Sequence, residues 1–486
     1  MNKILTIVIM AYLGIFVKLK DVFSKTIIFL NKQSLYIWYV FFFFVSYFVV
    51  TYLTLDKVSS LDDHFFHIRF AELLRERGIS VFTDFQSIYF SRMGIGQEYL
   101  VYYNFLFYIA LIPFTFLNPL VLGIKLYGVM ALSLSFLSVY VFLRKISVKY
   151  SFVWTFLFLV FLLQSGWLFR LTLARPFTLA PVFLVWMLYF VHQRKYKFSA
   201  AVAFLYFYWH TATFFFPLCL ALGYFLFEQF YGKRPDWRKI LWPSIGTLVA
   251  VFLAYLISPG VVAYLRDVIF PVFFDTALTK TTKIAEGGEV YGKNFFVTFS
   301  SFFYFLVVLF IAGTYEILRY VQEKRCVNKK EDGMNMSIQP LRAMLFMASI
   351  VFLAASALSS RFLDYFVYFC LLYIAIAGTD LMKFFEIGGE LFRRSFRFGV
   401  IMISTFLFIS LSLGFYDSIA GSKSYLIAQA PAAWLNSNLK KNNVIFNVDW
   451  DSFPTLYYFT GDKFRYTTGL EPRFLYDLDP ELYWTW

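Results

Sequence analysis

Apolar stretches of about twenty residues recur along the chain, and clusters of Lys and Arg separate them. A stretch of that length spans the roughly 30 Å hydrocarbon core of a bilayer as one α-helix. The first clear example is 36–55, YIWYVFFFFVSYFVVTYLTL. The pattern predicts an all-α polytopic membrane protein and excludes a cytosolic globular enzyme.

The composition agrees with this fold class. Hydrophobic residues make up 60% of the chain and charged residues only 15%, whereas soluble chains are about a quarter charged. The net charge of +14 is explained by Lys and Arg in cytoplasmic loops, so we expect no nucleic-acid partner. The three cysteines have no metal or redox spacing, and they predict neither a disulfide framework nor a zinc site.

We expect about 11–13 transmembrane helices in all. Beyond 36–55, the apolar segments fall near 99–117, 119–143, 151–168, 176–192, 198–211, 212–227, 240–258, 296–317, 340–358, 362–379 and 398–415. Alternating these helices places the later basic clusters in the cytoplasm only if 99–117 does not cross the membrane. This segment contains Pro113 and ends at Asn118-Pro119, so we expect it to be re-entrant or interfacial.

This layout divides the chain into three parts in a cell membrane. Residues 1–35 form a cytoplasmic or interfacial N-terminal segment, and 36–415 form the transmembrane domain. That domain has two long outer loops, 56–98 and 259–295. Residues 416–486 form a small extracytoplasmic α/β segment, which is too short for a rich core of its own and should pack on the membrane domain. Its aromatic residues continue up to Trp486, which leaves open a longer outer domain.

The first outer loop contains an amphipathic helix predicted over 62–77. Its apolar face carries Phe66, Phe70, Leu73 and Leu74, and its polar sides carry Asp63, His67 and residues 69–72. Asp62 and Asp63 stand at its start, where carboxylates serve either as helix caps or as functional groups. In the functional reading they hold a divalent cation or take a proton from an acceptor. His64 and His67, three residues apart, are close enough to share a ligand, although no third zinc ligand is evident.

A motif in this helix carries a family resemblance. Asp63, Phe66, His67 and Arg69 fit the pattern D-x-x-[YF]-H-x-R. This resembles the first outer loop of archaeal oligosaccharyltransferase catalytic subunits, which are membrane glycosyltransferases of the GT-C class. The resemblance implies a GT-C-like fold and a polyprenyl-(pyro)phosphate-linked sugar donor in the bilayer. It also implies that Asp63, helped by Asp62, binds Mg²⁺ or Mn²⁺ near the acceptor.

Two further elements are similar to the same family. Arg361, Phe362 and Tyr365 match its R-F-x-x-Y element at the outer end of a late helix. The implied role of Arg361 is contact with the donor phosphate, and the alternative is a side chain that snorkels to the interface. The loop 259–295 has the place of the family's mobile loop with a catalytic Glu, which would be Glu289 or Glu286. A solvated loop carboxylate is the alternative there.

The C-terminal segment follows the order of the family's soluble domain. Trp450 and Asp451 match part of its W-W-D-Y-G motif, which implies contact with an acceptor. The family's second acidic pair is absent, because 167–176 carries Arg170 and Arg175 and no carboxylate. A cation would then bind weakly through Asp62 and Asp63 or not at all, and the two arginines would attract phosphate instead.

The leading hypothesis is transfer of a sugar or oligosaccharide to a glycan, lipid or protein acceptor outside the cell. Asp63 would orient or deprotonate the acceptor, and Arg361 with Arg170 or Arg175 would neutralise the leaving phosphate. His210, in the run YWHTAT, would line the cavity or serve as a structural interface residue. Alternatives are a polymerase or ligase of lipid-linked glycans, a transporter or flippase, and a structural scaffold.

Overall fold

The fold was analysed in a computed structural model of the chain. It describes residues 38–39, 41–46, 63–84, 104–149, 151–164, 173–257, 260–266, 309–310, 313–314, 339–356, 360–387, 425–447, 452–467 and 481. The segment 1–35, most of the outer loop 259–295 and the predicted helix 398–415 lie outside these residues.

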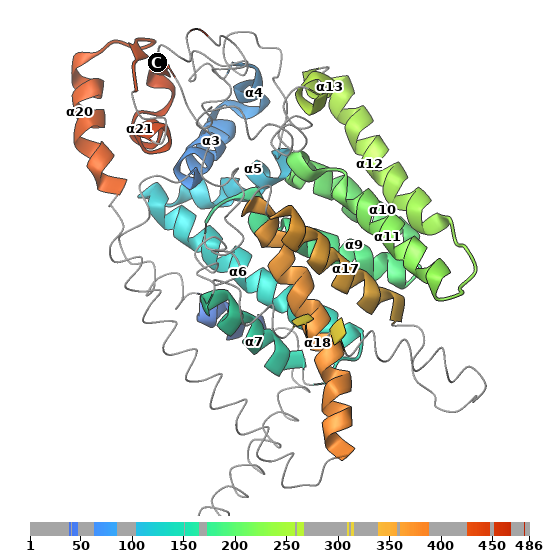
Figure 1. The fold of residues 1–486 in the computed structure, drawn as a ribbon. Coiled ribbons are helices and arrows are strands. Elements are labelled where there is room, and N and C mark those ends of the chain that lie inside the picture. The colour runs from blue at the N-terminus through green and yellow to red at the C-terminus, as the bar shows by residue number, and fades with distance from the viewer. Residues whose placement is uncertain are drawn as a thin grey trace, which may run out of the picture.

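The described part of the chain is built almost entirely of helices (Figure 1). The membrane part contains α6 (Leu120–Lys145), α7 (Ser151–Gln164), α9 (Ala180–His192), α10 (Tyr196–Trp209), α11 (Phe216–Phe230), α12 (Arg238–Ile257), α13 (Gly260–Tyr264), α17 (Gln339–Ala355) and α18 (Leu363–Ile387). Short 3-10 helices precede four of them: η2 (Ile112–Phe116), η3 (Pro176–Thr178), η4 (Thr211–Thr213) and η6 (Ser360–Phe362).

Three helical segments in the described residues are long and apolar enough to cross a membrane. They are Leu120–Lys145, Thr211–Phe230 and Arg238–Ile257. The outward face of α12 exposes Leu248, Phe252 and Leu256, which recur every fourth residue and are 58–65% accessible. A contiguous apolar face of this kind suits contact with lipid. The all-α membrane fold expected from the sequence is thus supported.

The predicted re-entrant segment is short and broken. It consists of α5 (Phe105–Leu111) followed directly by η2, with Pro113 at the start of η2. Seven α-helical residues rise only about 10 Å, far less than the bilayer core. The segment packs on α6, where a Cβ added at Gly123 would lie 2.2 Å from the Phe114 carbonyl oxygen. Only glycine allows this approach.

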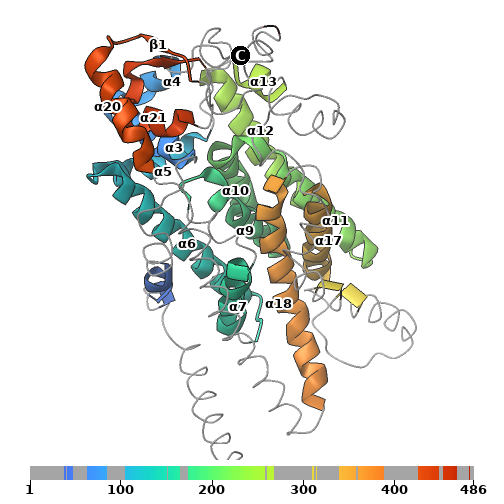
Figure 2. The same ribbon diagram turned by 60° about the vertical axis from the view of Figure 1, so that its left-hand side comes forward.

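Two of the predicted cytoplasmic basic clusters lie at the end of the bundle away from the first-loop helix. Arg194 follows α9, and Lys233 precedes α12. In Figures 1 and 2, α12 starts on the side away from α3 and ends at α13, near the level of α3 and α4. At the basic end, Lys239 forms a buried ion pair with Glu228. The Tyr224 hydroxyl donates to Glu228 as well.

The first-loop helix α3 (His64–Arg77) is followed by η1 (Gly78–Ser80) and α4 (Val81–Asp84). The sequence pattern placed His67 on a polar side of this helix, and that prediction is wrong. His67 is buried, and so are His64 and the apolar face. The helix is enclosed rather than water-exposed, since α5 and η2 pack on one side and the C-terminal segment packs on the other.

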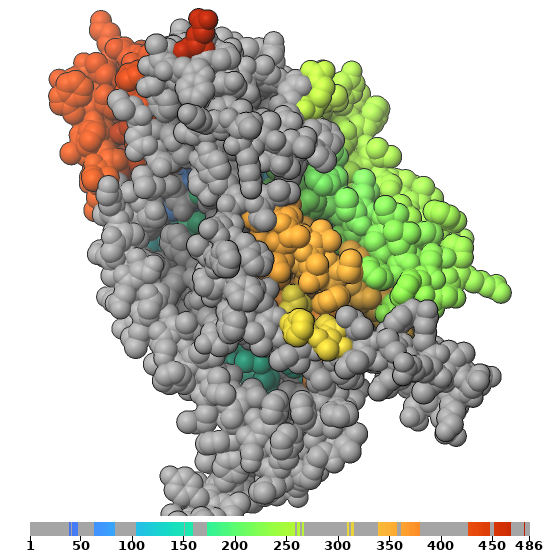
Figure 3. All heavy atoms as spheres, in the orientation of Figure 1, coloured from blue at the N-terminus to red at the C-terminus, as the bar shows by residue number. Residues whose placement is uncertain are grey.

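The C-terminal segment is a small α/β unit. In chain order it contains η7 (Tyr425–Ala428), α20 (Gln429–Asn438), β1 (Val444–Ile445), α21 (Phe453–Thr460), η9 (Gly461–Lys463) and β2 (Arg465–Tyr466). The two strands pair in parallel. The ring of Phe65 in α3 contacts Tyr458 of α21 at a centroid distance of 5.1 Å. The segment therefore packs on α3, as its small size led us to expect (Figure 2), and it forms one outer corner of the surface in Figure 3.

Candidate functional site

Asp63 stands immediately before α3. Its backbone carbonyl accepts the first helical hydrogen bond, from His67 N–H at 2.9 Å, but its side chain makes no capping bond to the helix. The Oδ2 atom of Asp63 instead lies 3.4 Å from Nη2 of Arg175. The side chain of Asp63 is 37% exposed and that of Arg175 only 7%. A buried cation therefore faces a carboxylate that is partly open to solvent.

The turn that carries Arg175 is well fixed. The Arg175 N–H donates to the carbonyl of Leu173 at 2.9 Å, and the Thr178 hydroxyl donates to the same carbonyl at 3.1 Å. Pro176 begins η3 directly after Arg175. The guanidinium carbon lies 5.4 Å from the centre of the Phe177 ring, within the range of a cation–π contact. These contacts hold the guanidinium in place before any ligand arrives.

His210 ends α10 and lies in a cluster of hydroxyl groups. Its Nδ1 is 2.7 Å from the Thr213 hydroxyl and 2.9 Å from the Tyr365 hydroxyl. Those two hydroxyls are 3.1 Å apart, and Tyr206 contacts both of them. His210 is thus held in place by two hydroxyl groups from different segments of the chain.

Arg361 is exposed in η6, four residues before Tyr365. The neighbouring Phe362 is stacked near Phe352 and Phe216, with ring centroids 6.4 and 6.2 Å apart. These aromatic contacts anchor the short helix at the start of α18. The R-F-x-x-Y element thus presents a cation outward while Tyr365, buried, reaches His210.

A hydrogen bond connects the two halves of the site. The indole Nε1 of Trp209 donates to the carbonyl of Pro176 at 2.6 Å. Trp209 precedes His210 and Pro176 follows Arg175, so the turns that carry these two polar side chains are joined. Asn104, before α5, exchanges two 3.1 Å hydrogen bonds with Thr211. The re-entrant segment is thereby tied to the same turn.

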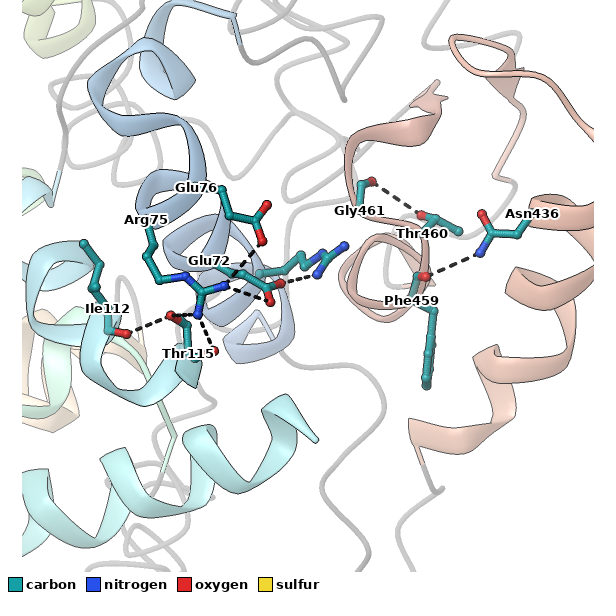
Figure 4. Close-up of polar contacts among 10 residues, drawn as sticks. Glu72, Arg75, Glu76, Ile112, Thr115, Asn436, Phe459, Thr460 and Gly461 are labelled. Carbon is teal, nitrogen blue, oxygen red and sulfur yellow. Dashed lines mark hydrogen bonds and ion pairs between the residues drawn. The ribbon is translucent and has the colours of Figure 1, made fainter. Parts of the chain in front are cut away.

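The position of α3 depends on the re-entrant segment and the C-terminal segment. His67 Nδ1 lies 3.0 Å from the Tyr108 hydroxyl of α5. Arg75 donates to the carbonyl of Thr115 in η2 at 2.7 Å, and Figure 4 shows this clamp between α3 and η2. On the opposite side, the guanidinium of Arg69 pairs with Glu72 and lies against Gly461. His67 and Arg69 therefore help to orient α3.

The described residues around Asp63 do not fit a divalent cation. Mg²⁺ and Mn²⁺ need several oxygen ligands, and no group of three or more His, Cys, Asp or Glu gathers within the described ranges. Arg175 already contacts the carboxylate. Unit charges about 4 Å apart interact by roughly 4 kcal/mol at an effective dielectric constant of about 20, and a divalent ion at such a distance would be repelled about twice as strongly.

Several predicted site residues lie outside the described residues. They are Asp62, Arg170, Glu286, Glu289, Trp450 and Asp451. Among the described ones, the structure brings Asp63 to Arg175 and places His210 beside the R-F-x-x-Y element. Sequence reasoning missed Thr213 and Trp209. The spacing of His210 and Thr213, three residues apart in H-T-A-T, was the available signal for the first, whereas nothing in the sequence signalled the bond from Trp209.

No protein-family model matches the chain, and no curated protein matches it at a significant level.

Proposed function

We propose that the chain is a membrane glycosyltransferase of the GT-C type. It would transfer a sugar or oligosaccharide from a polyprenyl-phosphate-linked donor to a glycan, lipid or protein acceptor. One observation carries the proposal: the first-loop Asp63 meets Arg175 next to the turn of His210, and His210 contacts the R-F-x-x-Y element. Segments distant in sequence thus place a reachable carboxylate and an exposed cation on one side of the bundle.

The arrangement supports a simple displacement. An acceptor oxygen attacks the anomeric carbon of the sugar, and the bond from that carbon to the phosphate oxygen breaks. The phosphate leaves with the electron pair, and the acceptor proton passes to the carboxylate of Asp63. Arg361 would neutralise the charge that develops on the leaving phosphate. The role of His210 in this scheme would be to hold Tyr365 behind Arg361.

The proposed topology follows from the charge distribution. The basic loops would lie in the cytoplasm, together with residues 1–35, and α3 and the C-terminal segment would lie outside a cell membrane. The full chain would cross it about 11–13 times. This orientation brings Asp63 and Arg361 to the outer headgroup level, where a lipid phosphate lies.

Transfer by the purified protein in lipid nanodiscs tests the function. Polyprenyl phosphate carrying a radiolabelled hexose serves as the donor, and release of free polyprenyl phosphate reports bond cleavage. The wild type should release it in the presence of acceptor, whereas a flippase would move the donor and leave it intact. Asp63→Asn should lower turnover by about 100-fold or more, the scale of a positioned acid–base group.

Asp462→Asn is the matched control. Asp462 also pairs with an arginine, Arg77, but on the far end of α3. This variant should keep wild-type turnover. Equal turnover in Asp63→Asn and the wild type would contradict the proposed role of Asp63.

Arg361 provides the test of donor binding. Arg361→Lys keeps the charge but loses the planar fork that grips phosphate at two points, so turnover should fall while thermal stability stays. Arg361→Ala should weaken donor binding as well. Unchanged binding of polyprenyl-phosphate hexose to purified Arg361→Ala protein would remove Arg361 from the site.

A further inference from the structure

We propose that Arg175 occupies the place at Asp63 where a divalent cation is expected from the family resemblance, so that transfer proceeds without a bound metal. The catalytic part of this inference rests on the proposed glycosyltransferase function. The arrangement of charges does not depend on that function, because it concerns only whether Arg175 or a metal ion lies beside the carboxylate of Asp63.

The sequence and the structure point to the same replacement. The stretch 167–176 stands where the resembled family places its second acidic pair, and here it contains two arginines and no carboxylate. The structure shows that one of them, Arg175, reaches Asp63. The stretch 167–176, where the resemblance implies metal ligands, thus supplies the positive charge of Arg175. That charge contacts Asp63, the other metal ligand that the resemblance implies.

The guanidinium of Arg175 is a buried part of the fold and not a mobile surface group. The side chain of Arg175 is 7% exposed, and its backbone is fixed by the bond to Leu173 and by the proline that follows. The adjoining Pro176 carbonyl is held by Trp209. A loosely held surface arginine would swing away from an arriving metal ion, whereas this side chain is confined by the packing around it.

In this position Arg175 is a positioning residue. It attracts the carboxylate of Asp63 and fixes its direction while leaving the exposed part of that side chain open to the acceptor. It also supplies a permanent positive charge close to the reacting groups. The resulting site should be insensitive to chelators, and the supply of Mg²⁺ or Mn²⁺ should not control its activity.

Titration with Mn²⁺ tests the replacement directly. Free Mn²⁺ is measured by electron paramagnetic resonance in the presence of purified wild-type protein, Asp63→Asn and Arg175→Asp. The wild type should bind no more Mn²⁺ than Asp63→Asn. Arg175→Asp removes the positive charge beside Asp63 and adds a carboxylate nearby, so it should bind Mn²⁺ more tightly than the wild type, and adding Asp63→Asn to this variant should abolish the gain.

Two results would overturn the inference. One is an equivalent of Mn²⁺ that the wild type binds and Asp63→Asn loses. The other is a folded Arg175→Asp protein that binds Mn²⁺ no more tightly than the wild type, because the positive charge of Arg175 would then not be what keeps a cation away from Asp63.

If Arg175→Asp does not fold, the wild type still decides the question. After dialysis against EDTA its turnover should change less than twofold, and a loss that Mg²⁺ or Mn²⁺ restores would refute the inference. If no donor is turned over at all, the proposed function fails, while the Mn²⁺ titration of the wild type against Asp63→Asn still answers the question about the metal.

Discussion

Substituting Gly123 by Ala should displace the support of the candidate site. The added methyl group would lie 2.2 Å from the carbonyl oxygen of Phe114, where an ordinary contact is about 3.4 Å or more. A backbone carbonyl cannot rotate away as a side chain can. The η2 segment must therefore withdraw from α6 by about 1 Å, and Thr115, which clamps Arg75 of α3, moves with it.

Two opposing effects set the size of the change. Ala in a helix is favoured over Gly by about 1 kcal/mol, whereas overpacking costs about 1–3 kcal/mol. Because the clash is with backbone, we expect the upper end of that cost and a net destabilisation of about 2 kcal/mol. Turnover should fall further, since a 1 Å displacement of a catalytic group can cost about 100-fold.

Two matched Gly→Ala variants separate these effects in thermal unfolding and transfer assays. Gly223 in α11 faces only the flexible end of Met344, so its variant should be as stable as the wild type. A Cβ added at Gly246 in α12 would lie 2.1 Å from the carbonyl oxygen of Ala200 in α10. It should lose stability like Gly123→Ala but keep most of its turnover. Equal loss of turnover in the Gly123 and Gly246 variants would refute specific displacement of the site.

Two further predictions concern topology and stability. In a cysteine-free background, an impermeant thiol reagent added outside should label a cysteine placed at Lys440 and not one placed at Lys145; the reverse pattern would invert the layout. Glu228→Gln should lower the free energy of unfolding, measured by chemical denaturation, by about 3–5 kcal/mol, because Lys239 would remain buried without its carboxylate. Replacing both residues by Leu should recover much of this loss.

The helices were accessible to sequence reasoning because membrane helices follow from local hydropathy. The segments expected at 119–143, 240–258 and 340–358 agree with α6, α12 and α17 within a few residues. The break near Pro113 was also predicted, since a proline acts locally, whereas the re-entrant or interfacial path of 99–117 stays a prediction. How many segments span the membrane beyond the three long described helices stays a prediction.

The site was harder to predict because its contacts join distant parts of the chain. Asp63 and Arg175 were each singled out, but as separate metal and phosphate ligands, since sequence spacing does not reveal which loops meet. The burial of His67 was missed for the same reason. Its exposure depends on α5 and α21, whose packing on α3 is not encoded within α3 itself.

The packing of α21 on α3 also has a consequence for biosynthesis. A chain emerges from its N-terminal end, so α3 is made well before α21, whose Tyr458 covers Phe65 and which follows the described membrane helices in the sequence. Contacts between such distant segments form late in folding. The candidate site would therefore remain incomplete until the helices between α3 and α21 have been made and α21 has followed them.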